Sequence, residues 1–151
     1  MTTTAEPPPL TRPVESRDPN TGEVWQTFQP ASRGEIATAV ATARDAQKRW
    51  REVPLRERAR AIDRVRREIY ARRDLLATTL QREIGKPAFD ALFEVLITAD
   101  SANYAARQAP RAFRTRSVQP WYPAMLRNRV EIHWEPYGVV GVIAPWNYPY
   151  L

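Results

Sequence analysis

The chain has 151 residues, of which 43% are hydrophobic and 26% are charged, a balance typical of a globular protein with one modest core. It contains no cysteine, which excludes disulfides, thiolate metal sites and a thiol nucleophile supplied by this chain. Its one histidine, His133, excludes a two-histidine metal site, and we expect no metal centre.

The positive charge of the chain comes almost entirely from arginine. The net charge is +6, but Lys48 and Lys86 are the only lysines, and the arginines are most concentrated between residues 56 and 73. Within that stretch Asp63 and Arg67 stand four positions apart, the spacing of an ion pair on a helix surface. A nucleic-acid footprint would also need aromatic or base-reading partners, so the charge favours a solvated helix face, and we expect no nucleic-acid partner.

No targeting signal or membrane span is evident in the sequence. The opening MTTTAEPPPLTRP lacks an apolar core, and no run approaches the roughly 20 apolar residues that cross a bilayer. We therefore expect a soluble, cytoplasmic protein without a membrane partner.

The start of the chain predicts a tail followed by a hairpin. Residues 1–13 are rich in proline and threonine and cannot bury enough apolar area to become ordered, so we expect them to form a flexible tail. In RDPNTGEVWQTF, residues 17–28, the turn-forming residues 19–22 precede a period-two alternation over residues 24–28. This pattern predicts a short β-hairpin.

The next part of the chain predicts about four helices. Three proline-free stretches lie between Pro30, Pro54, Pro87 and Pro110, and Ser32 with Glu35 forms a capping-box signature at the start of the first. A break near residues 73–74 divides the second stretch into two helices, and Pro87 can occupy the first turn of the last helix. Each helix has an apolar stripe at three- and four-residue spacing. The stripes are Ile36, Val40, Ala43, Gln47 and Trp50; Ala59, Ile62, Val65 and Ile69; Leu76, Leu80 and Ile84; and Leu92, Leu96, Ala99, Asn103 and Ala106.

Beyond Pro110 the helical periodicity stops. Residues 111–125 mix basic, proline and aromatic residues without a steady period, which indicates a long surface connection. Residues 129–134 alternate, with apolar side chains on one face and polar ones, including His133, on the other. This alternation predicts a half-exposed strand on which His133 faces solvent rather than a metal or a nucleophile.

The stretch GVVGVIAP, residues 138–145, is apolar without alternation, which predicts a strand over 138–144 that is covered on both faces, as in a parallel α/β sheet. Ligands of such sheets bind just beyond the carboxyl ends of the strands, where Pro145, Trp146 and Asn147 follow. The Asn147 amide could stabilise an oxyanion from a loop stiffened by prolines. The Asn147 side chain could equally form hydrogen bonds to the backbone of its own turn. The spacing alone does not distinguish these two interpretations.

Four blocks of the sequence resemble the front part of the NAD(P)-dependent aldehyde dehydrogenase superfamily. They are DPNTGEV (18–24), REIGKPAFDALFEV (82–95), YAARQAP (104–110) and EPYGVVGVIAPWNYPYL (135–151), and some similar members are succinate-semialdehyde dehydrogenases. Ile84 departs from the family, which usually has threonine there. The resemblance implies an α/β fold in which residues 14–151 form the N-terminal helical part and the first parallel strand of an incomplete Rossmann-type cofactor domain.

By the same resemblance, Asn147 matches the family's asparagine that donates to the thiohemiacetal oxyanion. Ile143, Ala144, Pro145 and Trp146 match the segment that runs along the bound NAD or NADP. The implied partners are an aldehyde substrate and further copies of the chain, because the family assembles as homo-oligomers partly through the region of 129–134. Gly138 and Gly141 lie before the loop, so no phosphate cradle is expected there.

The family's catalytic cysteine and general-base glutamate lie downstream of the regions that these blocks match. We therefore expect this chain to be a fragment that neither oxidises aldehydes nor binds a dinucleotide tightly by itself. An alternative is a non-catalytic interaction module that pairs with full-length relatives through its helices or the 129–134 strand. A third hypothesis is a basic helical nucleic-acid binder, which the motif blocks do not require.

Overall fold

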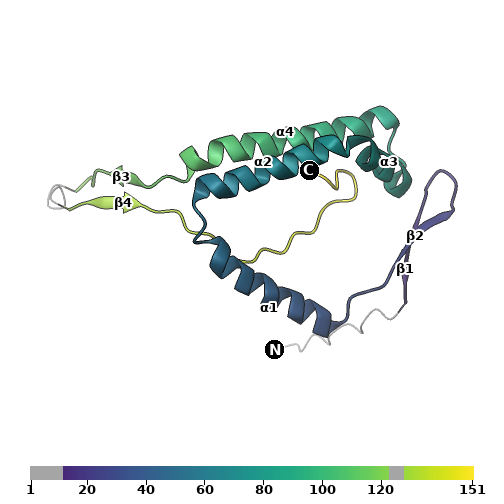
Figure 1. The fold of residues 1–151 in the computed structure, drawn as a ribbon, viewed down its shortest axis with the longest axis horizontal. Helices are drawn as coiled ribbons and strands as arrows, with labels where there is room; N and C mark the ends of the chain where they lie inside the picture. Colours follow the sequence, from purple (N-terminus) through teal and green to yellow (C-terminus); the bar gives the residue numbers. More distant parts are fainter. Residues whose placement is uncertain (1–11, 123–127) are drawn as a thin grey trace.

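The computed structural model of the chain describes residues 12–122 and 128–151, so the predicted flexible tail lies almost entirely outside the described residues. Figure 1 shows a hairpin, a diverging helix, a packed group of helices and a second two-stranded ribbon at the far end. The elements in chain order are β1 (Val14–Arg17), β2 (Val24–Phe28), α1 (Arg33–Trp50), α2 (Leu55–Ala71), α3 (Arg73–Ile84), α4 (Ala88–Ala112), β3 (Arg116–Val118) and β4 (Val130–Ile132).

The hairpin β1–β2 is antiparallel, with Val14 opposite Phe28. Its turn is closed by the backbone N–H of Gly22, which donates to the carbonyl of Asp18 at 2.7 Å. Gly22 has a φ of 75°, a conformation that favours glycine. The turn residues therefore produce a hairpin where the sequence predicts one.

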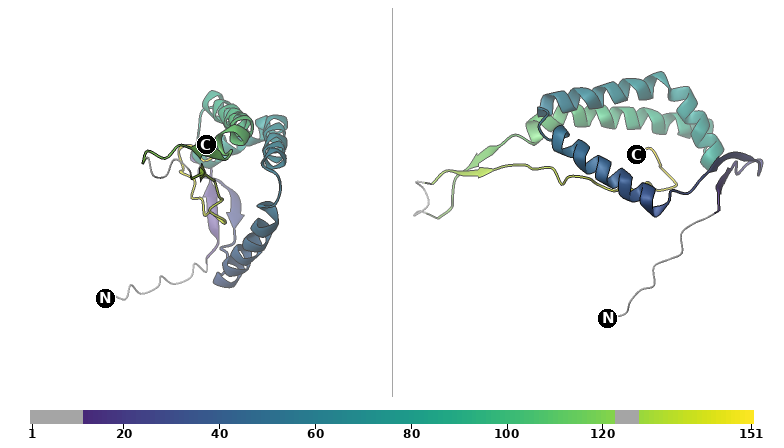
Figure 2. Two further views of the ribbon diagram at one scale, coloured as in Figure 1. Left: turned by 90° about the vertical axis from the view of Figure 1, so that its left-hand side faces the viewer. Right: turned by 60° about the horizontal axis from the view of Figure 1, so that its bottom comes forward.

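Helix α1 begins at the predicted capping box. The Ser32 hydroxyl accepts from the Glu35 N–H at 3.2 Å, and the Glu35 carboxylate accepts from the Ser32 N–H at 2.8 Å. No residue of α1 is buried, and Ile36 and Trp50 of its apolar stripe are 53% and 45% exposed. Because α1 diverges from the other helices, as both panels of Figure 2 show, no other described helix packs on its apolar stripe.

The core lies where α3 packs on α4, and α2 lies beside α4 along most of its length (Figure 1). It contains Ala77 and Leu80 from α3 and Ala91 and Val95 from α4, all at most 6% exposed. The predicted break near residues 73–74 is present, since α2 ends at Ala71 and α3 begins at Arg73. Alternating small and large side chains at this contact let the two helices approach closely.

The buried face of α4 differs from the predicted stripe. The buried residues are Ala91, Glu94, Val95 and Ala99, so of the predicted stripe only Ala99 is fully buried. The predicted stripe follows the larger apolar residues Leu92 and Leu96, which are only partly buried, whereas Ala91 and Val95, one position earlier, are fully buried. Helix α4 also continues past the expected end at Pro110 to Ala112, where the Phe113 N–H still donates to Ala109 at 3.0 Å.

A second antiparallel ribbon joins β3 to β4, with Arg116 opposite Ile132 and Val118 opposite Val130. The strand predicted over residues 129–134 is formed over Val130–Ile132 only. Its partner β3 lies within the stretch predicted to be an irregular connection, because three residues are too few to show a period. Residues 123–125, the last part of that predicted connection, lie outside the described residues.

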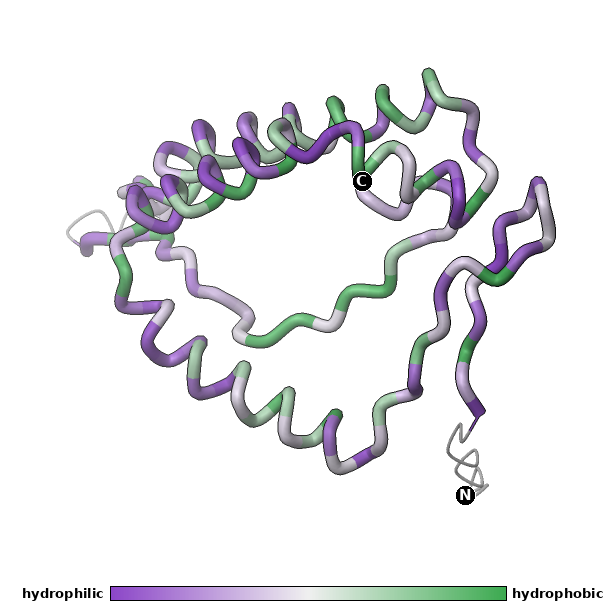
Figure 3. The backbone as a smooth tube through the Cα atoms, turned by 45° about the vertical axis from the view of Figure 1, so that its right-hand side comes forward, coloured by the Kyte–Doolittle hydropathy of each residue, from purple (hydrophilic) through white to green (hydrophobic). Residues whose placement is uncertain are grey.

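The strand predicted over residues 138–144 is not formed. This segment is irregular, and Val142 and Ile143 are 83% and 98% exposed. A parallel strand requires hydrogen-bonding neighbours, and the described residues contain two antiparallel pairs and no strand beside this segment. Figure 3 shows the segment as a mostly hydrophobic path between α1 and the packed helices. Among the described helices, none has the length and apolarity to cross a bilayer.

Candidate active-site loop

The last residues of the chain return to the packed helices α2, α3 and α4 (Figure 1). The side chain of Tyr150 packs against the core, and its hydroxyl donates to the carbonyl of Leu76 at 3.5 Å. The backbone N–H of Tyr150 donates to the Glu94 carboxylate at 2.9 Å, and its carbonyl accepts from the Thr98 hydroxyl at 3.2 Å. The loop that carries Asn147 is thus anchored just beyond that residue.

A buried ion pair forms the surface on which the loop lies. Gly85 ends α3 in the left-handed conformation, with a φ of 66°, and Lys86 follows it directly. The Lys86 ammonium contacts the Glu94 carboxylate, and the two side chains are 12% and 0% exposed. Both charges are therefore removed from water and satisfied by each other, as buried charges require.

The same ammonium contacts the loop. Lys86 Nζ donates to the backbone carbonyl of Asn147 at 2.8 Å and lies 4.0 Å from the centroid of the Tyr148 ring, which is a cation–π contact. Burial, and then the nearby charges of Glu94 and Glu83, raise the pKa of the Tyr150 hydroxyl. That hydroxyl therefore remains protonated at neutral pH and able to donate.

The Asn147 side chain is exposed, and within residues 12–122 and 128–151 it makes no hydrogen bond. A depression of about 400 Å³ borders it, lined by Ile84, Gly85, Lys86, Pro87, Asp90, Phe93, Trp146, Asn147 and Tyr148. The structure thus brings the predicted site residues Trp146 and Asn147 together with Lys86. The predicted cofactor residues Ile143, Ala144 and Pro145 are exposed and do not border this depression.

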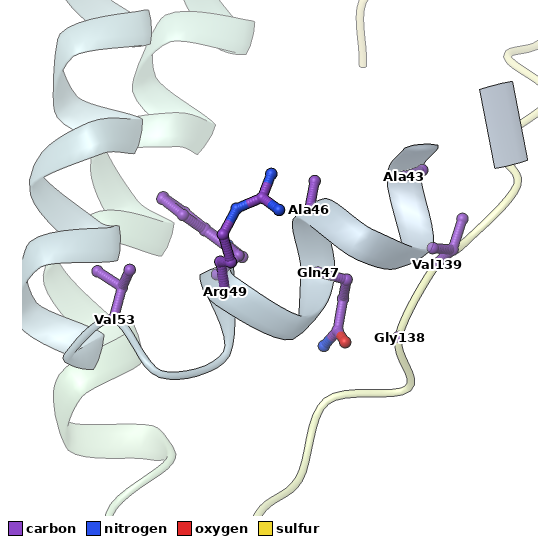
Figure 4. A pocket seen from close by; sticks show the side chains of 8 residues that line it. Ala43, Ala46, Gln47, Arg49, Val53, Gly138 and Val139 are labelled. Carbon is purple, nitrogen blue, oxygen red and sulfur yellow. The ribbon is translucent and has the colours of Figure 1, made fainter. Parts of the chain in front are cut away.

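A larger depression of about 510 Å³ lies between α1 and the residues around Val139 (Figure 4). Figure 4 shows that α1 supplies mainly the small or apolar positions Ala43 and Ala46, with Gln47 and Arg49 as its polar members. None of the predicted site residues borders it. It is an apolar surface left between α1 and the irregular 138–144 segment rather than a site with a set of reactive groups.

His133 lies away from both depressions and is exposed, as predicted. Its Nδ1 is 3.2 Å from the Thr115 hydroxyl, and its Nε2 is 3.2 Å from the Glu131 carboxylate. Among the described residues no group of three or more histidines and carboxylates could hold a metal ion.

Four further residues belong to this site and were not predicted from the sequence: Lys86, Glu94, Thr98 and Tyr150. One signal was available: Glu94 lies three positions after Ala91 and one before Val95, so a helix that buries those two residues also buries a carboxylate. A carboxylate on a buried face requires a cation or donors nearby. Identifying those partners required knowledge of where the loop returns.

Comparison with known proteins shows the family of the chain. A sequence profile of the aldehyde dehydrogenase family matches residues 7–151, and the chain belongs to that family. It is 37% identical over 129 residues to a Mycobacterium ulcerans protein named as an NADP+-dependent succinate-semialdehyde dehydrogenase, covering 85% of this chain and 24% of that protein. It is 32% identical over 138 residues to 4,4'-diapolycopene aldehyde oxidase of a Methylomonas species, covering 91% of this chain and 26% of that protein.

Solved structures show the same fold. The succinic semialdehyde dehydrogenase of Streptococcus pyogenes in complex with NADP+ matches with a TM-score of 0.82 and 26% identity over 90% of this chain and 29% of that one. An aldehyde dehydrogenase of Physcomitrella patens in complex with the product succinate matches with a TM-score of 0.83 and 26% identity over 91% and 29%. The chain thus spans about a quarter of the length of the relatives that it matches.

Proposed function

We propose that this chain supplies the oxyanion donor of an NAD(P)+-dependent aldehyde dehydrogenase that oxidises an aldehyde to a carboxylic acid. The observation that carries the proposal is the state of Asn147: its amide is exposed and unpaired in the described structure, while its backbone carbonyl is held by Lys86 at 2.8 Å. An asparagine that stabilised its own turn would have its side chain hydrogen-bonded to the backbone of that turn. A fixed backbone with a free amide supports a role toward a ligand.

The chemistry requires groups outside these residues. The chain has no cysteine, so the thiolate that attacks the aldehyde carbon must come from elsewhere in the functional enzyme. That attack converts the carbonyl oxygen into an oxyanion, to which the Asn147 amide donates a hydrogen bond. NAD(P)+, when bound, accepts the hydride. Ile143 and Trp146, 98% and 85% exposed, offer uncovered apolar surface of the kind that a dinucleotide can lie against.

The substrate and the assembly belong to the proposal as well. Relatives named as succinate-semialdehyde dehydrogenases make short semialdehydes the first substrates to assay, with both NAD+ and NADP+. We propose further that the functional enzyme is a homo-oligomer and cytoplasmic. The exposed edges of β3 and β4 can pair with another chain and support the oligomer.

The test uses a hybrid in which this chain replaces the corresponding first quarter of a complete relative. Asn147→Ala should lower kcat by roughly 10²- to 10³-fold and leave dinucleotide affinity nearly unchanged, because the lost bond forms mainly in the transition state. Asn147→Asp should be at least as damaging, since a carboxylate repels the oxyanion. Asn128→Ala, which removes an exposed amide from a site remote from the loop, is the matched control.

The opposite result has a distinct signature. If Asn147→Ala costs about 1 kcal/mol of stability with kcat nearly intact, Asn147 is a structural turn residue and the proposal fails. For the 151-residue chain alone, calorimetric titration with either dinucleotide should give no saturable signal. Saturable binding at micromolar concentration would point to a stand-alone cofactor-binding function instead.

A second candidate is a non-catalytic module that pairs with full-length relatives. The observation that favours it is the β3–β4 ribbon, whose Val118, Val130 and Ile132 side chains are 41%, 39% and 39% exposed. The hybrid enzyme separates the two functions, because Asn147→Ala should leave kcat unchanged if the chain only binds and should lower kcat if Asn147 is the oxyanion donor.

A further inference from the structure

The ion pair of Lys86 and Glu94 contacts the loop at two main-chain positions that bracket its turn. We infer that these two side chains are positioning residues that fix the direction of the Asn147 amide, an inference that rests on the proposed role of Asn147. Lys86 and Glu94 contact the backbone of the loop and not the Asn147 side chain, so each acts through that backbone.

Lys86 holds the loop at Asn147 itself. Its ammonium has three N–H donors, and the structure directs it toward the Glu94 carboxylate, the Asn147 carbonyl at 2.8 Å and the face of Tyr148 at 4.0 Å. A bond to the carbonyl fixes the orientation of the peptide plane that follows Asn147. That plane is attached to the same Cα as the side chain, so the direction in which the amide leaves the backbone is restricted.

Glu94 holds the loop three residues further on. One carboxylate oxygen contacts Lys86, and the other accepts the Tyr150 N–H at 2.9 Å. The carboxylate thus orients the ammonium and anchors the loop at the same time. With Thr98, which donates to the Tyr150 carbonyl at 3.2 Å, the loop is held on both sides of its bend.

Stability alone is a weak reason for this pair. A buried ion pair gives little net stability compared with apolar residues of similar volume, because both charges lose their hydration. Besides their contact with each other, the side chains of Lys86 and Glu94 form hydrogen bonds with the backbone of the loop and not with α3 or α4. A displacement of about 1 Å in a reacting group can lower the reaction rate by about 10²-fold. Precise anchoring of Asn147 can therefore have a large effect on the rate.

A double-mutant cycle in the hybrid enzyme tests the coupling between Lys86 and Asn147. Lys86→Met keeps most of the volume and removes the donors; we expect it to lower kcat by about 10- to 100-fold with dinucleotide affinity unchanged. In an Asn147→Ala background the same change should cost less than about 3-fold, because the amide that Lys86 orients is already gone. Lys48→Met, the same substitution at the other lysine, exposed on α1, is the matched control.

The outcomes separate the two claims. If Asn147→Ala leaves kcat intact, the proposed function fails whatever Lys86 does. If Asn147→Ala lowers kcat but Lys86→Met has no effect, or an effect that multiplies with it, the positioning inference is overturned and the proposed function stands. Lys86→Met leaves Glu94 unpaired and can impair folding, so the pair Lys86→Met with Glu94→Gln, which carries no unpaired charge, is measured alongside and should show the same non-additivity.

Hydrogen exchange on the 151-residue chain gives a readout that is independent of activity. Glu94→Ala should increase the exchange rate of the Tyr150 amide by about 10-fold or more, whereas Glu94→Gln, whose side-chain oxygen can still accept, should change it less. Amides in the core of α3 serve as the internal reference for global unfolding. An unchanged Tyr150 exchange rate in Glu94→Ala would show that Glu94 does not hold the loop.

Discussion

The Glu94 carboxylate accepts a hydrogen bond from the backbone N–H of Tyr150 at 2.9 Å, although the two residues are 56 positions apart. Three further bonds join the loop to the helices over similar separations, from Lys86, Thr98 and the Tyr150 hydroxyl. The final segment is therefore attached to the helical part by polar contacts and by the side chains of Tyr148 and Tyr150, not by sheet pairing.

Removal of one charge from the buried pair should be costly. Glu94→Ala leaves the Lys86 ammonium, 12% exposed, without its counter-charge, and we expect the free energy of unfolding to fall by about 3–5 kcal/mol. Chemical denaturation measures this change. The exposed pair Glu68–Arg72 provides the control, since Glu68→Ala should cost less than about 1 kcal/mol. Equal costs at the two sites would contradict the burial of the Glu94 pair.

The core between α3 and α4 should be sensitive to volume. Leu80 is 1% exposed, and Leu80→Ala should lower stability by about 2–5 kcal/mol through lost burial and a residual cavity. Leu75 on the same helix is 64% exposed, so Leu75→Ala should change stability by at most about 0.5 kcal/mol. Thermal unfolding of both variants tests the assignment. A larger effect at Leu75 would place the core on the other face of α3.

Gly85 should not tolerate a side chain. Its φ is 66°, and a Cβ there would lie 2.8 Å from Cγ of Pro19 in the hairpin turn. Gly85→Ala should therefore cost at least about 1–2 kcal/mol from the left-handed backbone alone. Gly34, inside α1 with its nearest neighbour atom at 4.0 Å, is the control, and Gly34→Ala should be neutral or stabilising. Denaturant midpoints of the two variants should thus move in different directions.

The capping box predicts an acid-sensitive helix start. The hydrogen bond from the Ser32 backbone, and then that from its hydroxyl, lower the pKa of Glu35. A lowered pKa means that the contribution of Glu35 is fully present above the pKa of an unfolded glutamate, about 4.3, and is lost as the pH falls through the lower folded value. Ser32→Ala removes the hydroxyl and keeps the backbone N–H, so NMR titration should show a Glu35 pKa that is still lowered, but by less than in the unaltered chain. Ser101→Ala on α4 should leave it unchanged.

The exposed apolar segment should drive self-association. Val142 and Ile143 are 83% and 98% exposed, and an unpaired apolar segment can pair with a second chain. Replacement of both by serine should shift the chain toward monomer in sedimentation velocity. Val65→Ser, at a half-exposed position on α2, should not. Association that persists in the double serine variant would assign the contact to another surface, such as the β3–β4 ribbon.

Features determined by nearby residues were predictable from the sequence. The capping box at Ser32, the hairpin turn that ends at Gly22 and the break between α2 and α3 depend on backbone groups within a few positions. The family assignment was also available, because the blocks that carry it retain their order and spacing.

Features that depend on distant partners were not predictable in the same way. The apolar pattern of residues 138–144 predicts a covered strand, but a strand forms only where a neighbour supplies hydrogen bonds, and the described residues supply none. The partner of Glu94 could not be identified either, since Tyr150 reaches it only after the chain has returned across the helices. The proposed role of Asn147 remains a prediction drawn from resemblance and supported by its free amide.

The separation in sequence between the two sides of the loop contact has a consequence for biosynthesis. Lys86 and Glu94 are eight positions apart at the α3–α4 corner, whereas their loop partners Asn147 and Tyr150 follow 61 and 56 residues later. Chains leave the ribosome N-terminus first, and contacts between nearby residues form before distant ones. We therefore expect the α3–α4 corner to fold during translation, while the segment with Asn147 is still inside the exit tunnel. The loop would then dock onto Lys86 and Glu94 after these two side chains are already in place.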